Sequence, residues 1–225
     1  MLTVIIPTLN AEMSLGKTLD SVAAAAQFAV AVVVIDGQST DQTQTLAQAA
    51  GATVIQSDPG RGLQLATGAK AAQGGWLLFL HADTVLPKGW DVEVHRFMAD
   101  PFNTERAAYF KLGFDEQSKK ARRVASIANW RAKALSLPYG DQGLLIHRSL
   151  YDLVGGYNAN LKLMEDVDLV QRLGPMRIKR LRACVVTSAQ KYRTDGWWAR
   201  PIRNILCLGL FLARAPNRWI ESLYK

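Results

Sequence analysis

Acidic side chains stand at positions where the predicted secondary structure could gather them. Asp36 and Asp83 each come just after an apolar run. Glu165 and Asp166 are adjacent where a helix is expected to begin. Carboxylates can hold a hard divalent cation, and a positioned carboxylate can take a proton from a hydroxyl group. These two uses require elements that bring the acids to one cleft.

The first half of the sequence alternates between short apolar runs and segments with helical periodicity. Asn10, the segment Ser39–Asp41 and Gly62 are predicted to open the intervening helices, with Gly51 ending the second one. This βαβ order predicts an α/β fold with a doubly wound, mostly parallel sheet flanked by helices. The predicted strands are Leu2–Pro7, Val30–Ile35, Thr53–Gln56 and Trp76–Leu80.

In such sheets the ligand crevice lies beyond the carboxyl ends of the strands. The residues that follow each predicted strand are therefore candidates for binding. They are Thr8-Leu9-Asn10, Asp36-Gly37, Ser57-Asp58 and His81-Ala82-Asp83.

The second half is less regular. A strand is predicted over Ala108–Phe114, and a basic helix over Gln117–Leu137. Glu165 is expected to begin a helix, and the tail from Trp197 is expected to be helical with a break near Pro216. The further predicted strands are Gly143–His147, Arg177–Arg182 and Val185–Ser188.

An ordered set of motifs resembles the family 2 glycosyltransferases of the GT-A fold, and is nearest to a small bacterial branch of them. The resemblance spans roughly residues 2 to 195. No linker interrupts it, so the chain is expected to be a single domain. The motifs are Val4–Asn10, Val33–Asp41, Leu80–Asp83, Gly140–Gly143, Gly155–Tyr157 and Met164–Leu169.

The resemblance implies an inverting transfer of a sugar from a nucleotide diphosphate sugar to an acceptor hydroxyl. Residues 1–100 would form the nucleotide-sugar-binding half, residues 101–195 the acceptor half, and residues 196–225 a helical tail. It also implies Mg²⁺ or Mn²⁺ at Asp83, where the ion would offset the diphosphate charge. His81 replaces the first acid of the usual DxD motif, which removes one carboxylate from that ion.

The candidate site residues divide by role. Asp166 is the expected base, with Glu165 beside it on the acceptor side. Adjacent helical side chains point about 100° apart, so only one of the two can face the sugar. Alternatively, acids in the first turn of a helix stabilise the helix dipole. Asp141 and Gln142 are expected at the sugars, and Lys191 and Arg193 at the diphosphate. The expected nucleotide-sugar-binding residues are Pro7, Thr8, Asn10, Asp36, Asp58, Arg61, His81 and Asp83.

The charge balance is basic, with 27 Lys and Arg against 19 Asp and Glu. The helix 117–137 and the tail interleave cations with tryptophans and aliphatic residues, which suits an anionic membrane surface and a lipid-linked acceptor. Core packing or a homodimer face would use the same stripes. No nucleic-acid motif accompanies the charge. Cys184 and Cys207 have no metal or disulfide pattern, and no signal peptide or spanning run is apparent. We therefore expect a cytoplasmic location, with peripheral contact to the inner membrane.

Two other functions fit parts of the sequence. A nucleotidyltransferase would also use a doubly wound sheet and a metal, but it would want a glycine-rich basic loop where Pro7–Asn10 stands. A nucleotide-sugar-binding or membrane-adaptor protein without catalysis would tolerate His81, since a site with fewer carboxylates binds a cation more weakly.

Overall fold

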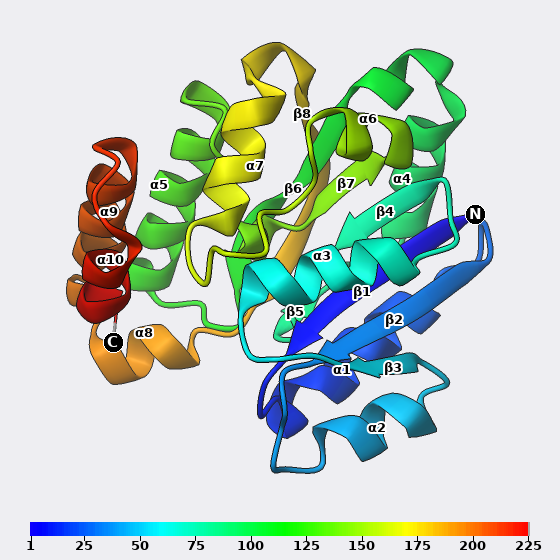
Figure 1. Cartoon of the computed structure of the whole chain (residues 1–225), viewed down its shortest axis with the longest axis horizontal. Coiled ribbons are helices and arrows are strands. Elements are labelled where there is room, and N and C mark those ends of the chain that lie inside the picture. The colour runs from blue at the N-terminus through cyan, green and yellow to red at the C-terminus, as the bar shows by residue number, and fades with distance from the viewer. Residues whose placement is uncertain (225) are drawn as a thin grey trace.

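The computed structural model describes residues 1–224, and an eight-stranded sheet forms the centre of this part of the chain (Figure 1). The strand order is β3-β2-β1-β4-β7-β6-β8-β5. The strands are β1 (Leu2–Thr8), β2 (Val30–Asp36), β3 (Thr53–Gln56), β4 (Trp76–Phe79), β5 (Thr84–Val85), β6 (Ala107–Phe114), β7 (Leu144–His147) and β8 (Ile178–Thr187).

Helices cover both faces of the sheet, which confirms the predicted doubly wound α/β fold. One core cluster joins α1, α2 and α4 to the sheet, and a second joins α3, α6 and α7 to its other face. Ile5 and Ile6 of β1 are both fully buried, one in each cluster. The helices are α1 (Glu12–Ala23), α2 (Thr43–Ala49), α3 (Arg61–Ala71), α4 (Trp90–Ala99), α6 (Arg148–Leu153) and α7 (Glu165–Leu173).

The strand directions change at the middle of the sheet. β1 pairs in parallel with β2 and β4, and β2 pairs in parallel with β3. β7 then runs antiparallel to β4 and β6, and β8 runs parallel to β6. The two predicted strands 177–182 and 185–188 form the single strand β8. The pairing register between β6 and β8 shifts between Tyr109 and Lys111, and the two strands stay paired on both sides of this shift.

Two helices begin later than predicted because their expected capping residues tie two loops together. Asn10 has φ of 50°, and its side-chain oxygen accepts a hydrogen bond from the Thr40 amide at 2.9 Å. Asp41 accepts one from the Glu12 amide at 3.1 Å and another from the Thr43 amide at 3.0 Å. The first helix therefore begins at Glu12 and the second at Thr43.

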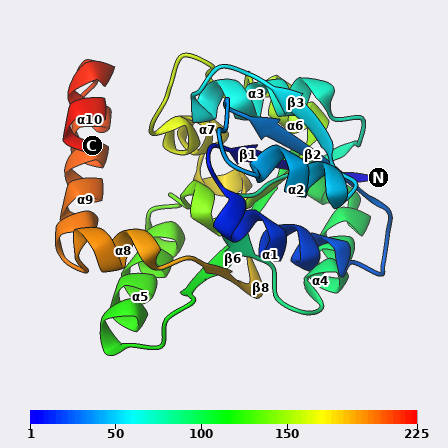
Figure 2. The ribbon, with the colours of Figure 1, turned by 90° about the horizontal axis from the view of Figure 1, so that it is seen from below.

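The last helices lie together at one end of the molecule, near α5 (Lys119–Ala134), in both views (Figures 1 and 2). Cys207 and Ile220 of this tail form a buried cluster with Met164 and Val167, the residues on either side of Glu165 and Asp166. The tail therefore packs on the start of α7. Among residues 1–224, no helix has the length and apolarity to cross a bilayer. The tail helices are α8 (Gln190–Asp195), α9 (Ala199–Leu212) and α10 (Asn217–Tyr224).

Candidate active site

A groove of about 680 Å³ runs along the carboxyl ends of β1 and β4. We call it the main groove. A smaller pocket adjoins it, which we call the side pocket. The two cavities share Arg61, His81, Asp83, Thr187, Ser188, Lys191 and Tyr224 in their walls. The main groove is further lined by Pro7, Thr8, Asn10, Lys17, Gly60, Gln64, Lys162 and neighbouring residues.

Asp83 and Asp166 line the same side pocket, whereas Asp36, the third acid that the sequence placed in this cleft, lines neither cavity. The Asp166 carboxylate accepts hydrogen bonds from the backbone amides of Gly140 at 2.7 Å and Val167 at 2.8 Å. These bonds fix the side chain at the first turn of α7 while leaving it in the pocket wall. An oriented carboxylate in a pocket is suited to accept a proton from a bound hydroxyl group.

Glu165 is held within the fold by an ion pair with Arg61. Its side chain is fully buried, and an oxygen lies 3.0 Å from Nε of Arg61. Burial raises the pKa of Glu165 to about 7, aided by the nearby Asp166 and opposed by Arg61. Because Glu165 lines neither the main groove nor the side pocket, its geometry suits holding Arg61 rather than acting as the base.

His81 and Asp83 stand side by side in the pocket wall. Burial, with the charges of Arg61 and Lys191, lowers the pKa of His81 to about 3, so its imidazole is neutral. Gly140 packs directly on this ring, since a Cβ there would lie 2.5 Å from Nε2. Any larger residue at position 140 would displace the imidazole that replaces the missing acid.

The residues around Asp83 can contribute to a cation site but do not enclose one. Nowhere in residues 1–224 do three or more His, Cys, Asp or Glu side chains form a group able to hold a metal. Asp141 lines the same pocket, and its buried Oδ1 has no hydrogen-bond partner in the protein. Burial raises the pKa of Asp141 to about 6, with Arg131 opposing and Asp166 and Asp83 adding to the rise. This donor set fits a divalent cation that completes its shell with phosphate oxygens.

Asp36, which was expected among the nucleotide-sugar-binding residues, lies beneath the main groove rather than in its wall. The side chain is fully buried. Its oxygens accept hydrogen bonds from the Thr8 and Ser39 hydroxyls at 3.0 and 2.6 Å and from the Gln44 amide at 2.9 Å. The Ser39 backbone amide adds a fourth bond at 2.9 Å. Asp36 therefore fixes the loops that follow β1 and β2.

Three further candidate residues line neither cavity. Gln142 is fully buried, and its amide donates to the Phe110 carbonyl at 3.1 Å, so it meets no pocket. Arg193 pairs with Asp115 and Glu116 at 3.5 and 3.4 Å and lies outside both cavities. Asp58 is exposed and accepts a bond from Gln38 at 3.0 Å, also away from them.

The tail supplies pocket residues that the sequence pattern did not reveal. Arg200 and Asn204, one turn apart on α9, line the side pocket together with Tyr224 of α10. Arg200 is nearly buried, pairs with Asp195 at 2.5 Å, and donates to the Tyr224 hydroxyl at 2.8 Å. Their i, i+4 spacing was visible, but nothing in it indicated which face of the helix would meet the site. The pocket wall also contains Tyr139 and Tyr192.

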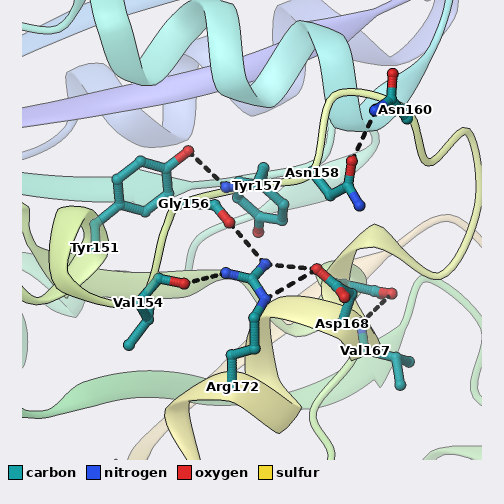
Figure 3. A network of polar contacts seen from close by, with 10 residues as sticks. Tyr151, Val154, Gly156, Tyr157, Asn158, Asn160, Val167, Asp168 and Arg172 are labelled. Atoms are coloured by element: carbon teal, nitrogen blue, oxygen red, sulfur yellow. Dashed lines mark hydrogen bonds and ion pairs between the residues drawn. The ribbon is translucent and has the colours of Figure 1, made fainter.

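The Gly155-Gly156-Tyr157 motif acts through α7 rather than in the pocket (Figure 3). Arg172 binds Asp168 on its own helix and donates to the carbonyls of Val154 and Gly156. Gly156 has φ of 61°, and a Cβ there would lie 2.8 Å from the Tyr151 ring, so only glycine fits. The motif therefore fixes the helix that carries Asp166.

Residues 3–149 match the family model described as glycosyl transferase family 2. The chain belongs to this family. The match covers the β1–β4 half and the start of the second half, and it ends before Asp166. Within family 2, a similar curated relative is the "PGL/p-HBAD biosynthesis glycosyltransferase" of Mycobacterium tuberculosis. It is 27% identical over 212 residues, which cover 85% of this chain and 77% of the relative.

Solved structures support the GT-A fold of this family 2 member. The mannosyltransferase PcManGT from Pyrobaculum calidifontis, in complex with GDP-Man and Mn²⁺, has a TM-score of 0.67 at 19% identity, covering 99% of this chain and 68% of that one. TarS 1–349 of S. aureus has a TM-score of 0.66 at 19% identity, covering 99% and 69%. Glucosyl-3-phosphoglycerate synthase from Mycobacterium tuberculosis, with Mn²⁺ and UDP, reaches 0.58 at 20%, covering 82% and 70%.

Proposed function

We propose that this family 2 glycosyltransferase moves a sugar, with inversion, from a nucleotide diphosphate sugar in the main groove to an acceptor hydroxyl in the side pocket. The observation that carries the proposal is the presence of Asp83 and Asp166 in one pocket wall, where that pocket adjoins the groove. A diphosphate held near Asp83 would put the sugar between the two carboxylates. An acceptor hydroxyl beside Asp166 would then attack the face opposite the leaving group.

Asp166 is the proposed catalytic base. Two backbone amides hold its carboxylate, so the side chain needs no rearrangement before accepting the proton of the acceptor hydroxyl. The attacking oxygen forms the new glycosidic bond as the bond to the diphosphate breaks. Positioned bases of this kind contribute about 10²–10⁴ in rate.

The leaving diphosphate would meet Lys191 and Arg61 at the shared wall of the two cavities. Asp83 would hold Mg²⁺ or Mn²⁺, with the neutral imidazole of His81 beside it. The cation, when bound, supplies positive charge for the diphosphate that departs. Pro7, Thr8 and Asn10 would bind the nucleoside end of the donor, while Asp36 supports their loops from below. Asp141, with its unpartnered oxygen, would meet either the sugar or the cation.

Donor binding can be tested by a thermal-shift screen of UDP-, GDP- and dTDP-sugars with and without Mn²⁺. A ligand at 100 times its Kd stabilises the native state by about 2.7 kcal/mol. We expect one nucleotide to raise the melting temperature further when Mn²⁺ is present, and Asp83→Asn to abolish that extra rise. Asp152→Asn, which changes an exposed acid on α6, is the matched control and should keep it.

Two results would contradict the proposal. If no nucleotide sugar stabilises the protein, the main groove is not a donor site. If Asp83→Asn retains the full Mn²⁺-dependent rise, the cation binds elsewhere. Stabilisation without any turnover of the donor across acceptor alcohols would favour the non-catalytic adaptor instead.

A further inference from the structure

Helix α9 has an apolar face that no other part of residues 1–224 covers. Trp198 and Ile205 are each 61% exposed there, and Trp219 of the adjoining α10 is 54% exposed. We call this surface the tail face. Its remaining large apolar residues are Ile202, Leu206 and Leu212.

The opposite side of α9 is the one that packs against the rest of the protein. Cys207 is buried against Met164 and Val167, and Arg200 and Asn204 line the side pocket. The helix is therefore apolar on the outside as well as on the inside. Exposed apolar surface of this extent, mixed with polar residues at its rim, marks an interaction site rather than ordinary surface.

Cations lie near the tail face, mainly on α5, and acids are nearly missing from its own helices. Helix α9 has no acidic residue; its Arg200 lines the side pocket, and Arg200 and Arg203 both pair with Asp195. Helix α10 balances Arg218 against Glu221. Helix α5 lies at the same end of the molecule in both views and also carries no acid (Figures 1 and 2). Its Trp130 is 64% exposed. The cations of α5 are Lys119, Lys120, Arg122, Arg123, Arg131 and Lys133.

We propose that the tail face, with the cations of α5 around it, binds the interface of an anionic lipid bilayer. Exposed tryptophans and aliphatic residues beside lysines and arginines match the interfacial region of such a membrane. A second copy of this chain is a poorer partner, because a two-fold interface would oppose two surfaces of the same positive sign. The charge pattern thus selects the bilayer over self-association.

This surface would also orient the active site, and this step rests on the proposed function. The side pocket contacts the inner face of α9, so the tail face lies directly behind the pocket wall. A protein docked through α9 would hold its acceptor pocket one helix away from the lipid headgroups. An acceptor hydroxyl on a lipid headgroup that extends past α9 would then reach Asp166 while the acyl chains stay in the bilayer.

The test is co-sedimentation of the whole chain with vesicles of phosphatidylcholine alone or with about one third phosphatidylglycerol. We expect binding to the anionic vesicles at low salt and at least tenfold weaker binding to the neutral ones. Ile205→Asp and, separately, Trp198→Ala should each reduce the anionic binding at least severalfold. Leu153→Asp, which changes a leucine that is 71% exposed on α6, should bind as the unchanged protein does.

The proposal is overturned if the unchanged protein does not sediment with anionic vesicles at low salt. It would also be overturned if Leu153→Asp weakens binding as much as Ile205→Asp. Sedimentation equilibrium without lipid supplies a third outcome: a dimer that Ile205→Asp dissociates would assign the tail face to a second copy. Melting temperatures identify an unfolded variant, and Trp198→Ala then decides alone. The assay contains no donor, and Asp166→Asn should bind vesicles normally, so failure here is distinct from failure of the proposed reaction.

Discussion

On the β1–β2 side of the site, the buried carboxylate of Asp36 accepts hydrogen bonds from Thr8, Ser39 and Gln44, and the loops it joins are held by the protein itself. On the α7 side, by contrast, two buried carboxyl groups are less completely satisfied, since Glu165 relies on its ion pair with Arg61. Asp141 has an oxygen without a hydrogen bond, and burial raises the pKa of both Asp141 and Glu165.

The difference indicates two kinds of construction. The first side is a preformed cradle, because the buried carboxylate at its centre, Asp36, is already satisfied. The second side contains buried carboxyl groups whose pKa values are raised, around the place where the reaction is proposed. Strongly shifted pKa values of this kind cluster at functional sites. Changes on the α7 side should therefore alter turnover and pH dependence, whereas changes at the cradle should alter stability.

The largest expected effect tests this contrast at Asp166. We expect Asp166→Asn to lower kcat by about 10²–10⁴, since the amide cannot accept the proton, while donor affinity stays unchanged. Single-turnover transfer and nucleotide titration measure the two quantities. Asp168→Asn, on the same turn of α7 but bound to Arg172, should instead lower the melting temperature. Full turnover in Asp166→Asn would place the base elsewhere.

Glu165 allows a prediction about stability. Its carboxyl has an ordinary pKa of 4.5 and a folded pKa of about 7, so between these values the native state keeps a proton that the unfolded chain has lost. Unfolding then releases a proton, and the contribution of Glu165 to the free energy of unfolding should fall as pH rises from 4.5 to 7, by up to about 1.4 kcal/mol per unit.

Urea unfolding of Glu165→Gln at pH 5, 6 and 7 checks this dependence. Relative to the variant, the unchanged protein should lose stability as the pH rises, because glutamine does not titrate. Glu105→Gln, an exposed site, should retain the decline seen in the unchanged protein. An equal slope in Glu165→Gln would mean that Glu165 is ionised throughout, paired with Arg61.

The regular half of the molecule was predictable because its signals are local. Apolar runs such as Leu2–Pro7 set the strands, and parallel strands place their carboxyl ends at one edge. That rule was enough to bring Thr8, Asn10 and Asp83 to the main groove. Asp166 was found from its place at a helix start in a family motif, and the structure puts it in the pocket with Asp83.

Whether the remaining candidate residues reach the site depends on how deeply they are buried and on packing between distant segments. The spacing of residues along the sequence predicts neither. Asp36 and Gln142 sit in plausible loops, but each is covered by neighbours from other segments. Arg200 and Tyr224 reach the pocket only because Cys207 and Ile220 pack the tail against α7. The residue pattern identified an apolar, cationic tail without indicating which of its faces the fold would use.

Alanine variants of Lys191 and Arg193 should have the smallest effects of those predicted here, but they compare a residue in the cavities with one outside them. Both were expected at the diphosphate, but Lys191 lines both cavities whereas Arg193 pairs with Asp115 and Glu116. A charge-assisted contact contributes about 1.5–3 kcal/mol, and solvent reduces this for an exposed lysine. We therefore expect Lys191→Ala to weaken binding of the best nucleoside diphosphate about tenfold and Arg193→Ala to change it less than about twofold, by calorimetric titration. Equal losses would mean that general surface charge, rather than a placed ammonium group, attracts the donor.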